Sequence, residues 1–241
     1  MMLTSLILVP LLGAIAVMFV PRGEDNRNVK VLAFGVSLVT LAMSLAMIAA
    51  FDINSGGIQL VEKYEWIPFI GAWYALGING TGLVLILLTT ILTPIVILAS
   101  WRDDLPDPSR THAYFAWMLV LQALAIGVFA ATDVFLFYVF FEATLVPLYF
   151  LIGAHGGAKR SKAAVKFLIY NLVGGLIMLA SIIGLYVIST QQGGPSFLHA
   201  DLAALDIPKN TEKWLFVGFF IAFAIKAPMF PLHTWLPDAA E

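Results

Sequence analysis

The sequence predicts an all-α polytopic membrane protein with seven transmembrane helices. Of its 241 residues, 61% are hydrophobic and only 12% are charged, whereas soluble domains carry about 45–50% apolar and about 25% charged residues. Seven apolar runs follow one another, each near the length of about 20 residues that crosses a bilayer as a helix. None of the runs alternates with a period of two, so a β-barrel is excluded and helices are expected.

The apolar runs define the expected helices in order. They cover residues 4–20, 31–51, 83–101, 113–131, 134–154, 167–190 and 214–232. The first run is expected to be a retained span, because no basic residue precedes it as in a signal peptide. The connection 52–82 is rich in aromatic residues, which favours a segment lying at the membrane interface. Asp133 precedes the fifth run and is expected to cap its N-terminus.

The basic residues predict the orientation. The first, third and fifth connections hold nine of them: Arg22, Arg27, Lys30, Arg102, Arg110, Lys159, Arg160, Lys162 and Lys166. The second, fourth and sixth connections hold Lys63, Lys209 and Lys213. The positive-inside rule then places the N-terminus outside and the odd connections in the cytoplasm.

Composition excludes several classes of function. The net charge is -2, so the chain has no basic field for binding nucleic acid. Its apolar runs make the lipid bilayer its expected surrounding. With no cysteine, it can form neither disulfides nor a thiolate-ligated iron–sulfur cluster. The four histidines lie in connections or near the ends of runs, which disfavours haem ligation.

Two charged residues lie deep inside apolar runs. Glu142 is the ninth residue of the run 134–154, where an ionised carboxylate costs several kcal/mol unless it is paired, so a functional role is the first hypothesis. A structural hydrogen-bonding role is the alternative. Lys226 lies far from either end of the run 214–232. Snorkelling to an interface is its alternative role, although the reach from mid-helix is poor.

The prolines after Lys226 predict a broken helix. Pro228 and Pro231 cannot donate to the carbonyl groups of Ala224 and Ala227, so the seventh helix should end at the lysine. Freed carbonyl groups at membrane depth persist only when protein buries them or when they face a water-filled cavity. Lys226 is therefore expected to be a hydrated, titratable group.

Three further polar residues are candidates for proton transfer. Lys166 begins the sixth helix, where it is either a modulating charge between Glu142 and Lys226 or a snorkelling surface residue. His233 follows Lys226 by seven residues, and Asp238 comes after it. These two either relay protons from the cytoplasm or form a polar cap near the membrane edge.

A buried acid and a buried base can couple their separation to proton movement. Moving one charge against about 150–200 mV costs about 3.5–4.6 kcal/mol. One pKa unit corresponds to about 1.4 kcal/mol, so a swing of about three units supplies that energy. Burial can shift the pKa of an ionisable group by that many units, whereas the pKa of a solvent-exposed group does not shift that far.

The motifs around these residues resemble a known family. They are FFEATLVPLYFLIG over 140–153, FFIAFAIKAP over 219–228, PLHTWLPDA over 231–239, LGING over 76–80 and LTTILTP over 88–94. Together they resemble the antiporter-like membrane subunits of respiratory complex I. The sequence departs from that pattern at Asn79, where the family has Asp, and at Ala240, where the family has His.

The resemblance implies a fold of about fourteen helices with two inverted repeats, each containing a broken helix. Residues 1–112 would be the first three helices with the outer loop 52–82. Residues 113–241 would hold helices four to seven, most of the first repeat, in a chain that is a fragment of a longer protein. In the family, an ion pair that maps onto Glu142 and Lys226 is essential, and Lys166 matches the lysine of helix six.

The resemblance also implies a function. The chain would be a proton-translocating subunit of NADH:quinone oxidoreductase in a bacterial cytoplasmic (inner) membrane, next to paralogous antiporter-like subunits. It would hold no cofactor and perform no redox chemistry, because NAD, FMN, iron–sulfur clusters and quinone belong to partner subunits. The alternatives are a subunit of a multi-subunit Na⁺/H⁺ antiporter or membrane-bound hydrogenase, and a scaffold that transports nothing.

Overall fold

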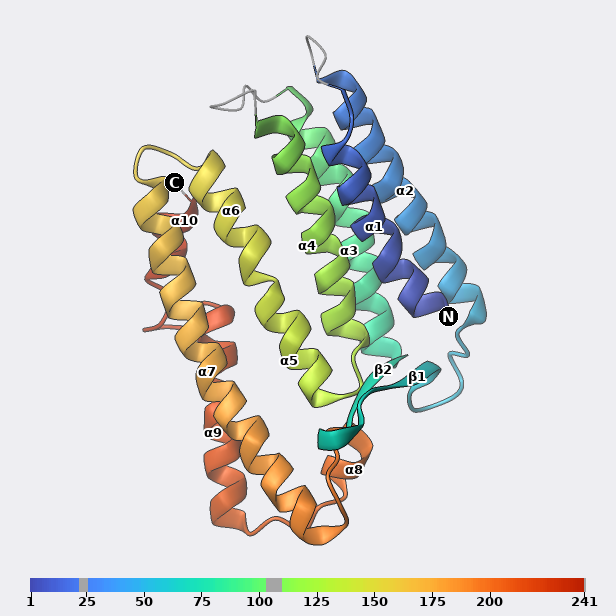
Figure 1. Ribbon diagram of the computed structural model, residues 1–241, viewed down its shortest axis with the longest axis vertical. Helices are drawn as coiled ribbons and strands as arrows, with labels where there is room; N and C mark the ends of the chain where they lie inside the picture. The colour runs from blue at the N-terminus through green and yellow to red at the C-terminus, as the bar shows by residue number, and fades with distance from the viewer. Residues whose placement is uncertain (22–25, 103–109, 241) are drawn as a thin grey trace. The chain divides into compact units, whose positions relative to one another are not determined.

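The computed structural model describes residues 1–21, 26–102 and 110–240 and is shown in Figure 1. It divides into two compact units, one of Met1–Glu62 with Leu76–Ala131 and one of Lys63–Ala75 with Thr132–Glu241. Arg22, one of the nine basic residues used to predict the orientation, lies outside the described residues.

Four α-helices build the first unit in the residues that the structure describes. They are α1 (Met2–Met18), α2 (Arg27–Ala50), α3 (Gly80–Ala99, followed by a short 3₁₀ turn, Ser100–Arg102) and α4 (Thr111–Ala130). Helices α1 and α3 each pack against both α2 and α4. The core includes Val29, Ile97 and Phe115, which are fully buried. Pro10 and Pro94 lie inside α1 and α3 without ending them.

The described part of the second unit, which contains the candidate site, has six α-helices. They are α5 (Val134–Ala143), α6 (Leu145–His155), α7 (Arg160–Gln192), α8 (His199–Ala203), α9 (Lys209–Lys226) and α10 (Trp235–Ala240). Helix α7, with 33 residues, packs against α5, α6, α9 and α10 (Figure 1). A cluster of Leu145, Phe167 and Trp235 joins α6, α7 and α10 in the core.

A two-stranded hairpin departs from the all-helical prediction. Strands β1 (Gln59–Ile67) and β2 (Ala72–Ile78) pair within the connection that was expected to lie at the membrane interface. The turn between them contains a short 3₁₀ helix, Pro68–Ile70, and Gly71 with φ +69°. A side chain at Gly71 would be strained and would also meet the Pro195 carbonyl oxygen, so the tight approach requires glycine.

The predicted cap of the fifth helix is confirmed. Asp133 Oδ1 accepts hydrogen bonds from the backbone N–H groups of Phe135 and Leu136, both at 2.9 Å. Asp133 Oδ2 accepts a third from the Trp73 N–H at 3.0 Å. The carboxylate therefore fastens the start of α5 to the hairpin strand β2.

The helix expected over 134–154 is interrupted, which corrects the prediction of an unbroken span. Helix α5 ends at Ala143 and α6 begins at Leu145, with Thr144 between them. Pro147 cannot donate to the carbonyl group of Ala143, which explains why the regular hydrogen-bond pattern fails here. Helix α6 nevertheless continues the course of α5 (Figure 1).

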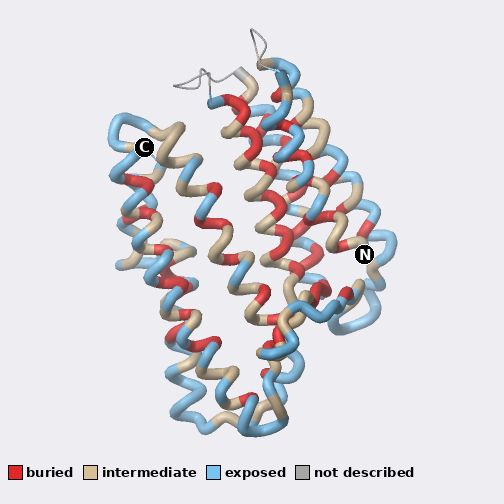
Figure 2. Tube along the Cα trace, viewed as in Figure 1, coloured by how far each residue is buried: buried red, intermediate tan, exposed pale blue. Residues whose placement is uncertain are grey.

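Length and composition make this a multi-pass membrane protein. Among the described residues, five helical segments are long and apolar enough to cross a bilayer: Arg27–Ala50, Gly80–Ala99, Thr111–Ala130, Val134–His155 and Arg160–Gln192. Helix α1 is a shorter apolar helix, and α9 carries Lys209, Glu212 and Lys213 in its first turns. Outward-facing residues recur along the helices of both units (Figure 2), and many of them are large and apolar, as lipid contact requires.

Candidate functional site

The predicted break after Lys226 is confirmed, and protein groups satisfy its carbonyl oxygens. Helix α9 ends at Lys226. The Met229 N–H donates to the Ala224 carbonyl at 2.8 Å, where Pro228 has no N–H to offer. The Trp235 indole Nε1 donates to the Ile225 carbonyl at 2.9 Å. These two bonds supply donors to the Ala224 and Ile225 carbonyl groups at the point where the chain leaves the helix.

Lys226 reaches from the end of α9 to the interruption between α5 and α6. Its Nζ donates to the Phe141 carbonyl at 3.0 Å and to Thr144 Oγ1 at 2.8 Å. The same nitrogen lies 4.0 Å from the centroid of the Phe141 ring, within the range of a cation–π interaction. The lysine therefore bonds to neutral acceptors at a point where a neighbouring helix is interrupted.

Glu142 points to α7. Its carboxylate occupies the space that a Cβ atom on Gly175 would take, so a side chain at this position would displace the carboxylate from its place between α5 and α7. Glu142 Oε1 is buried and has no hydrogen-bond partner. In the part of the chain that the structure describes, no ion pair joins Glu142 and Lys226, although the two are close enough to interact electrostatically.

Lys166 lies at the far end of the same unit's core, beside α10. Its Nζ donates to Asp238 Oδ2 at 2.6 Å and to the Thr234 carbonyl at 2.7 Å. This hydrogen bond with Lys166 lowers the pKa of the exposed Asp238 carboxyl below its ordinary value. The structure thus brings Lys166 together with Asp238 and does not place it between Glu142 and Lys226.

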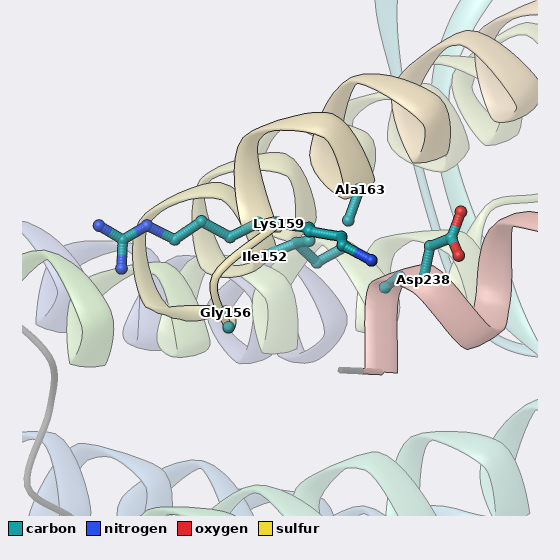
Figure 3. A pocket seen from close by; sticks show the side chains of 8 residues that line it. Ile152, Gly156, Lys159, Ala163 and Asp238 are labelled. Carbon is teal, nitrogen blue, oxygen red and sulfur yellow. The ribbon is translucent and has the colours of Figure 1, made fainter.

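Asp238 borders two small cavities. One is lined by Ile152, Gly156, Lys159, Ala163 and Asp238, among others (Figure 3). Its neighbour, of about 130 Å³, is lined by Lys159, Lys162, Ala163 and Asp238. Asp238 is therefore surrounded by the basic start of α7.

His233, the other predicted relay residue, has a different environment. Its Nδ1 is buried without a hydrogen-bond partner, and its ring lies 5.7 Å from the Phe230 ring. The next residue, Thr234, donates from its hydroxyl to the Tyr170 hydroxyl at 3.0 Å. His233 and Asp238 therefore lie at the same end of the unit but have separate partners.

Sequence reasoning missed the residues that hold the acid and the base. Thr144 and the Phe141 carbonyl bond to Lys226, and Gly175 makes room for Glu142. Pro147, five residues after Glu142, was the available signal, because the rule that predicted the break before Pro228 also applies to it. In the residues that the structure describes, no group of three or more His, Asp or Glu side chains could hold a metal ion.

Comparison with known proteins places this geometry in a family context. Residues 131–241 match the family model described as "NADH:quinone oxidoreductase/Mrp antiporter, TM". The NADH-quinone oxidoreductase subunit M of Mycobacterium tuberculosis is 45% identical over 99% of this chain and 49% of its own length. The chain is a homologue of NADH-quinone oxidoreductase subunit M. It spans about half the length of the curated subunit M proteins that it matches.

Solved structures share the fold of this chain. A chain of respiratory complex I from Thermus thermophilus superposes with a TM-score of 0.85 at 28% identity, over 100% of this chain and 47% of that one. A chain of the Mrp complex from Dietzia sp. shares the fold, with a TM-score of 0.81 at 22% identity, over 99% of this chain and 25% of that one. The predicted resemblance to antiporter-like subunits is therefore confirmed, and this subunit M homologue is a fragment of that fold.

Proposed function

We propose that this subunit M homologue is part of a proton-translocating membrane subunit of NADH:quinone oxidoreductase, and that Glu142 and Lys226 carry the proton. The observation that supports this most is the position of the Lys226 amine. It lies where α9 ends and where α5 gives way to α6, and it bonds to two neutral oxygens. An ammonium group held this way can approach or leave a neighbouring carboxyl without unfolding a helix.

The state of Glu142 is consistent with proton loading. Its carboxyl group is half-buried, with one oxygen buried and without a hydrogen-bond partner. Direct approach of the Lys226 ammonium would favour release of a proton from Glu142, and its withdrawal would favour uptake. Such alternation couples the separation of two side chains to the movement of one proton.

The energy would come from other subunits. In the proposal, NADH is oxidised and quinone reduced in partner subunits, which hold NAD, FMN, iron–sulfur clusters and quinone, while this chain holds no cofactor. Its neighbours would be paralogous antiporter-like subunits in a bacterial cytoplasmic membrane, with the N-terminus outside. The complete subunit would have about fourteen helices in two inverted repeats, with residues 1–112 before the first repeat and 113–241 within it.

Three further residues keep proposed roles in this pathway. Lys166 would modulate the pair electrostatically from its position beside Asp238. His233 and Asp238 would pass protons from the cytoplasm toward the interior. Pro228 and Pro231 would keep the helix open after Lys226, as their lack of N–H groups requires.

The test is NADH-driven proton pumping in membrane vesicles that contain the assembled complex. Glu142→Gln and Lys226→Ala should each lower pumping by about tenfold or more, as expected for loss of a proton-transferring group. Glu212→Gln and Lys213→Ala are matched controls, because both residues are exposed in the first turns of α9, and pumping should be unchanged. Undiminished pumping by Glu142→Gln would refute the assignment of that residue.

The same vesicles separate the alternative functions. The family match names both NADH:quinone oxidoreductase and the Mrp antiporter, so an antiporter subunit is the second candidate. It predicts Na⁺-dependent proton movement without NADH. A scaffold predicts that both substitutions leave transport intact.

A further inference from the structure

The Lys226 amine rests in a defined seat, which consists of the Phe141 carbonyl, the Thr144 hydroxyl and the Phe141 ring. The distances from Nζ are 3.0 Å to the carbonyl oxygen, 2.8 Å to the hydroxyl oxygen and 4.0 Å to the ring centroid. Phe141 and Thr144 are both buried, with 7% of their surface exposed. The seat is therefore an interior feature, shielded from the solvent that would weaken it.

The hydroxyl of Thr144 is oriented by its own neighbour. It donates its single proton to the Phe141 carbonyl at 2.7 Å, so toward Lys226 it can only accept. The carbonyl oxygen has two lone pairs and can accept from the hydroxyl and the amine together. Both oxygens of the seat can therefore accept a hydrogen bond from an N–H donor at the place where Lys226 lies.

The seat stabilises a charged lysine without a carboxylate. Two neutral oxygens and an aromatic face all attract an ammonium ion, while none of them carries a charge that would have to be neutralised. Glu142, the next residue after Phe141, has a buried oxygen without a hydrogen-bond partner. The Lys226 amine is thus held near Glu142 without forming an ion pair with its carboxylate.

We propose that Thr144 is a positioning residue that holds Lys226 away from Glu142, so that the lysine has two alternative positions. In one it occupies the seat, and in the other it pairs directly with Glu142. The flexible four-carbon stem of lysine allows the exchange by side-chain rotation. This proposal rests on the proposed function, because it assigns Thr144 a role only through the Glu142–Lys226 pair.

Substitution of Thr144 tests the seat in the assembled complex. Thr144→Val keeps the branched shape and removes the hydroxyl. The hydrogen bond that the Lys226 amine donates to Thr144 is then lost, which should shift the balance between the two lysine positions by about tenfold. NADH-driven pumping should fall by about the same factor. Thr144→Ser retains a hydroxyl and should restore pumping. Thr190→Val is the matched control, because the Thr190 hydroxyl is exposed and bonds only to its own helix at the Val187 carbonyl.

A spectroscopic readout separates positioning from packing. The infrared carboxylic-acid C=O band of Glu142, identified by its loss in Glu142→Gln, reports how much of Glu142 is protonated. If Thr144→Val brings Lys226 onto Glu142, this band should weaken, and Thr144→Ser should restore it. Thr144→Ala, which also lacks the hydroxyl, provides the same test where the valine variant does not assemble.

The outcomes distinguish the two proposals. Wild-type pumping and an unchanged Glu142 band in both hydroxyl-free variants would overturn the role of Thr144 and leave the role of Glu142 standing. Lower pumping with an unchanged band would also overturn it, since the defect would then lie in packing. Undiminished pumping by Glu142→Gln would instead refute the proposed function, on which the proposed role of Thr144 depends.

Discussion

The carboxylate of Glu142 fills the space beside Gly175 that any larger residue would need for its own Cβ atom. The acid and the glycine lie on different helices, α5 and α7, and more than thirty positions apart. Gly174, the preceding residue, faces Ile225 and Ala222 of α9 instead. Gly175 thus makes room on α7 for the acid of α5. Gly174 lets α9 approach α7 just before the base, Lys226.

Gly175→Ala should displace Glu142. The added methyl group would meet the atoms at the flexible end of the Glu142 side chain, so the carboxylate would have to move away while the helices stay in place. Pumping should fall by about tenfold with little change in stability. Vesicle pumping assays and thermal unfolding of the purified complex measure the two effects. Gly35→Ala, in the middle of α2 with open space around its missing Cβ, is the control and should leave both unchanged. A fully active Gly175→Ala would contradict the packing described for Glu142.

Trp235→Phe should weaken the region after the α9 break. The substitution keeps an aromatic ring but removes the indole N–H that binds the Ile225 carbonyl, and a buried acceptor without a partner costs about 1–3 kcal/mol. Thermal unfolding should show the loss. Trp214→Phe is the comparison, because Trp214 is 70% exposed and should give no change. Equal stability of the two variants would show that the Ile225 carbonyl finds another donor.

Glu62→Gln should destabilise the first unit in a pH-dependent way. Burial acts to raise the pKa of Glu62, but hydrogen bonds from the Thr4 hydroxyl and the backbone N–H groups of Leu3 and Thr4 outweigh it, so the pKa lies below its ordinary value of 4.5. A lowered folded-state pKa contributes stability that is present above pH 4.5 and is lost as the pH falls through the folded value.

Glu62 accepts hydrogen bonds from backbone N–H groups at the start of α1, and glutamine keeps one acceptor oxygen but loses the other together with the charge. This partial loss of the cap should cost about 0.5–2 kcal/mol at pH 7. Unfolding measured between pH 7 and pH 3 should show the difference from wild type shrinking on the acid side. Glu65→Gln, on an exposed position of the same strand, should be neutral throughout. A difference that grows in acid would reverse the sign argued for Glu62.

The Lys166–Asp238 pair should contribute little to stability. The side chains are 30% and 49% exposed, and ion pairs in water are screened by salt. Lys166→Ala, Asp238→Asn and the double variant should all unfold close to wild type, with any difference disappearing in high salt. A strong effect on pumping but not on stability would support a transport role for Lys166, and a large stability loss would show a structural one.

Sequence patterns predicted the features that depend on local chemistry. The end of α9 at Lys226 follows from the missing N–H of Pro228, and the cap by Asp133 follows from its place before an apolar run. The presence of a proline does not by itself determine whether a helix is interrupted, however. Pro10 and Pro94 lie within unbroken helices, whereas α5 and α6 are interrupted before Pro147.

The difference lies in tertiary partners that no local pattern reveals. At the interruption before Pro147, the Phe141 carbonyl receives hydrogen bonds from Thr144 and Lys226, and Lys226 comes from a helix more than eighty positions away. The placement of Glu142 against Gly175 likewise depends on how α5 and α7 pack. Hydropathy predicted that an acid and a base lie within the apolar runs, but not which groups surround them.

One partner of Lys226 is a main-chain oxygen, and this has a consequence for sequence divergence. No side-chain replacement at position 141 deletes that carbonyl, so homologous chains can exchange the aromatic ring and still offer the amine the same acceptor. Only backbone chemistry, such as an ester in place of the following amide, would weaken it directly. Of the two oxygens that accept hydrogen bonds from the amine, only the hydroxyl belongs to a side chain, which makes position 144 the place to look for tuning of these hydrogen bonds between related subunits.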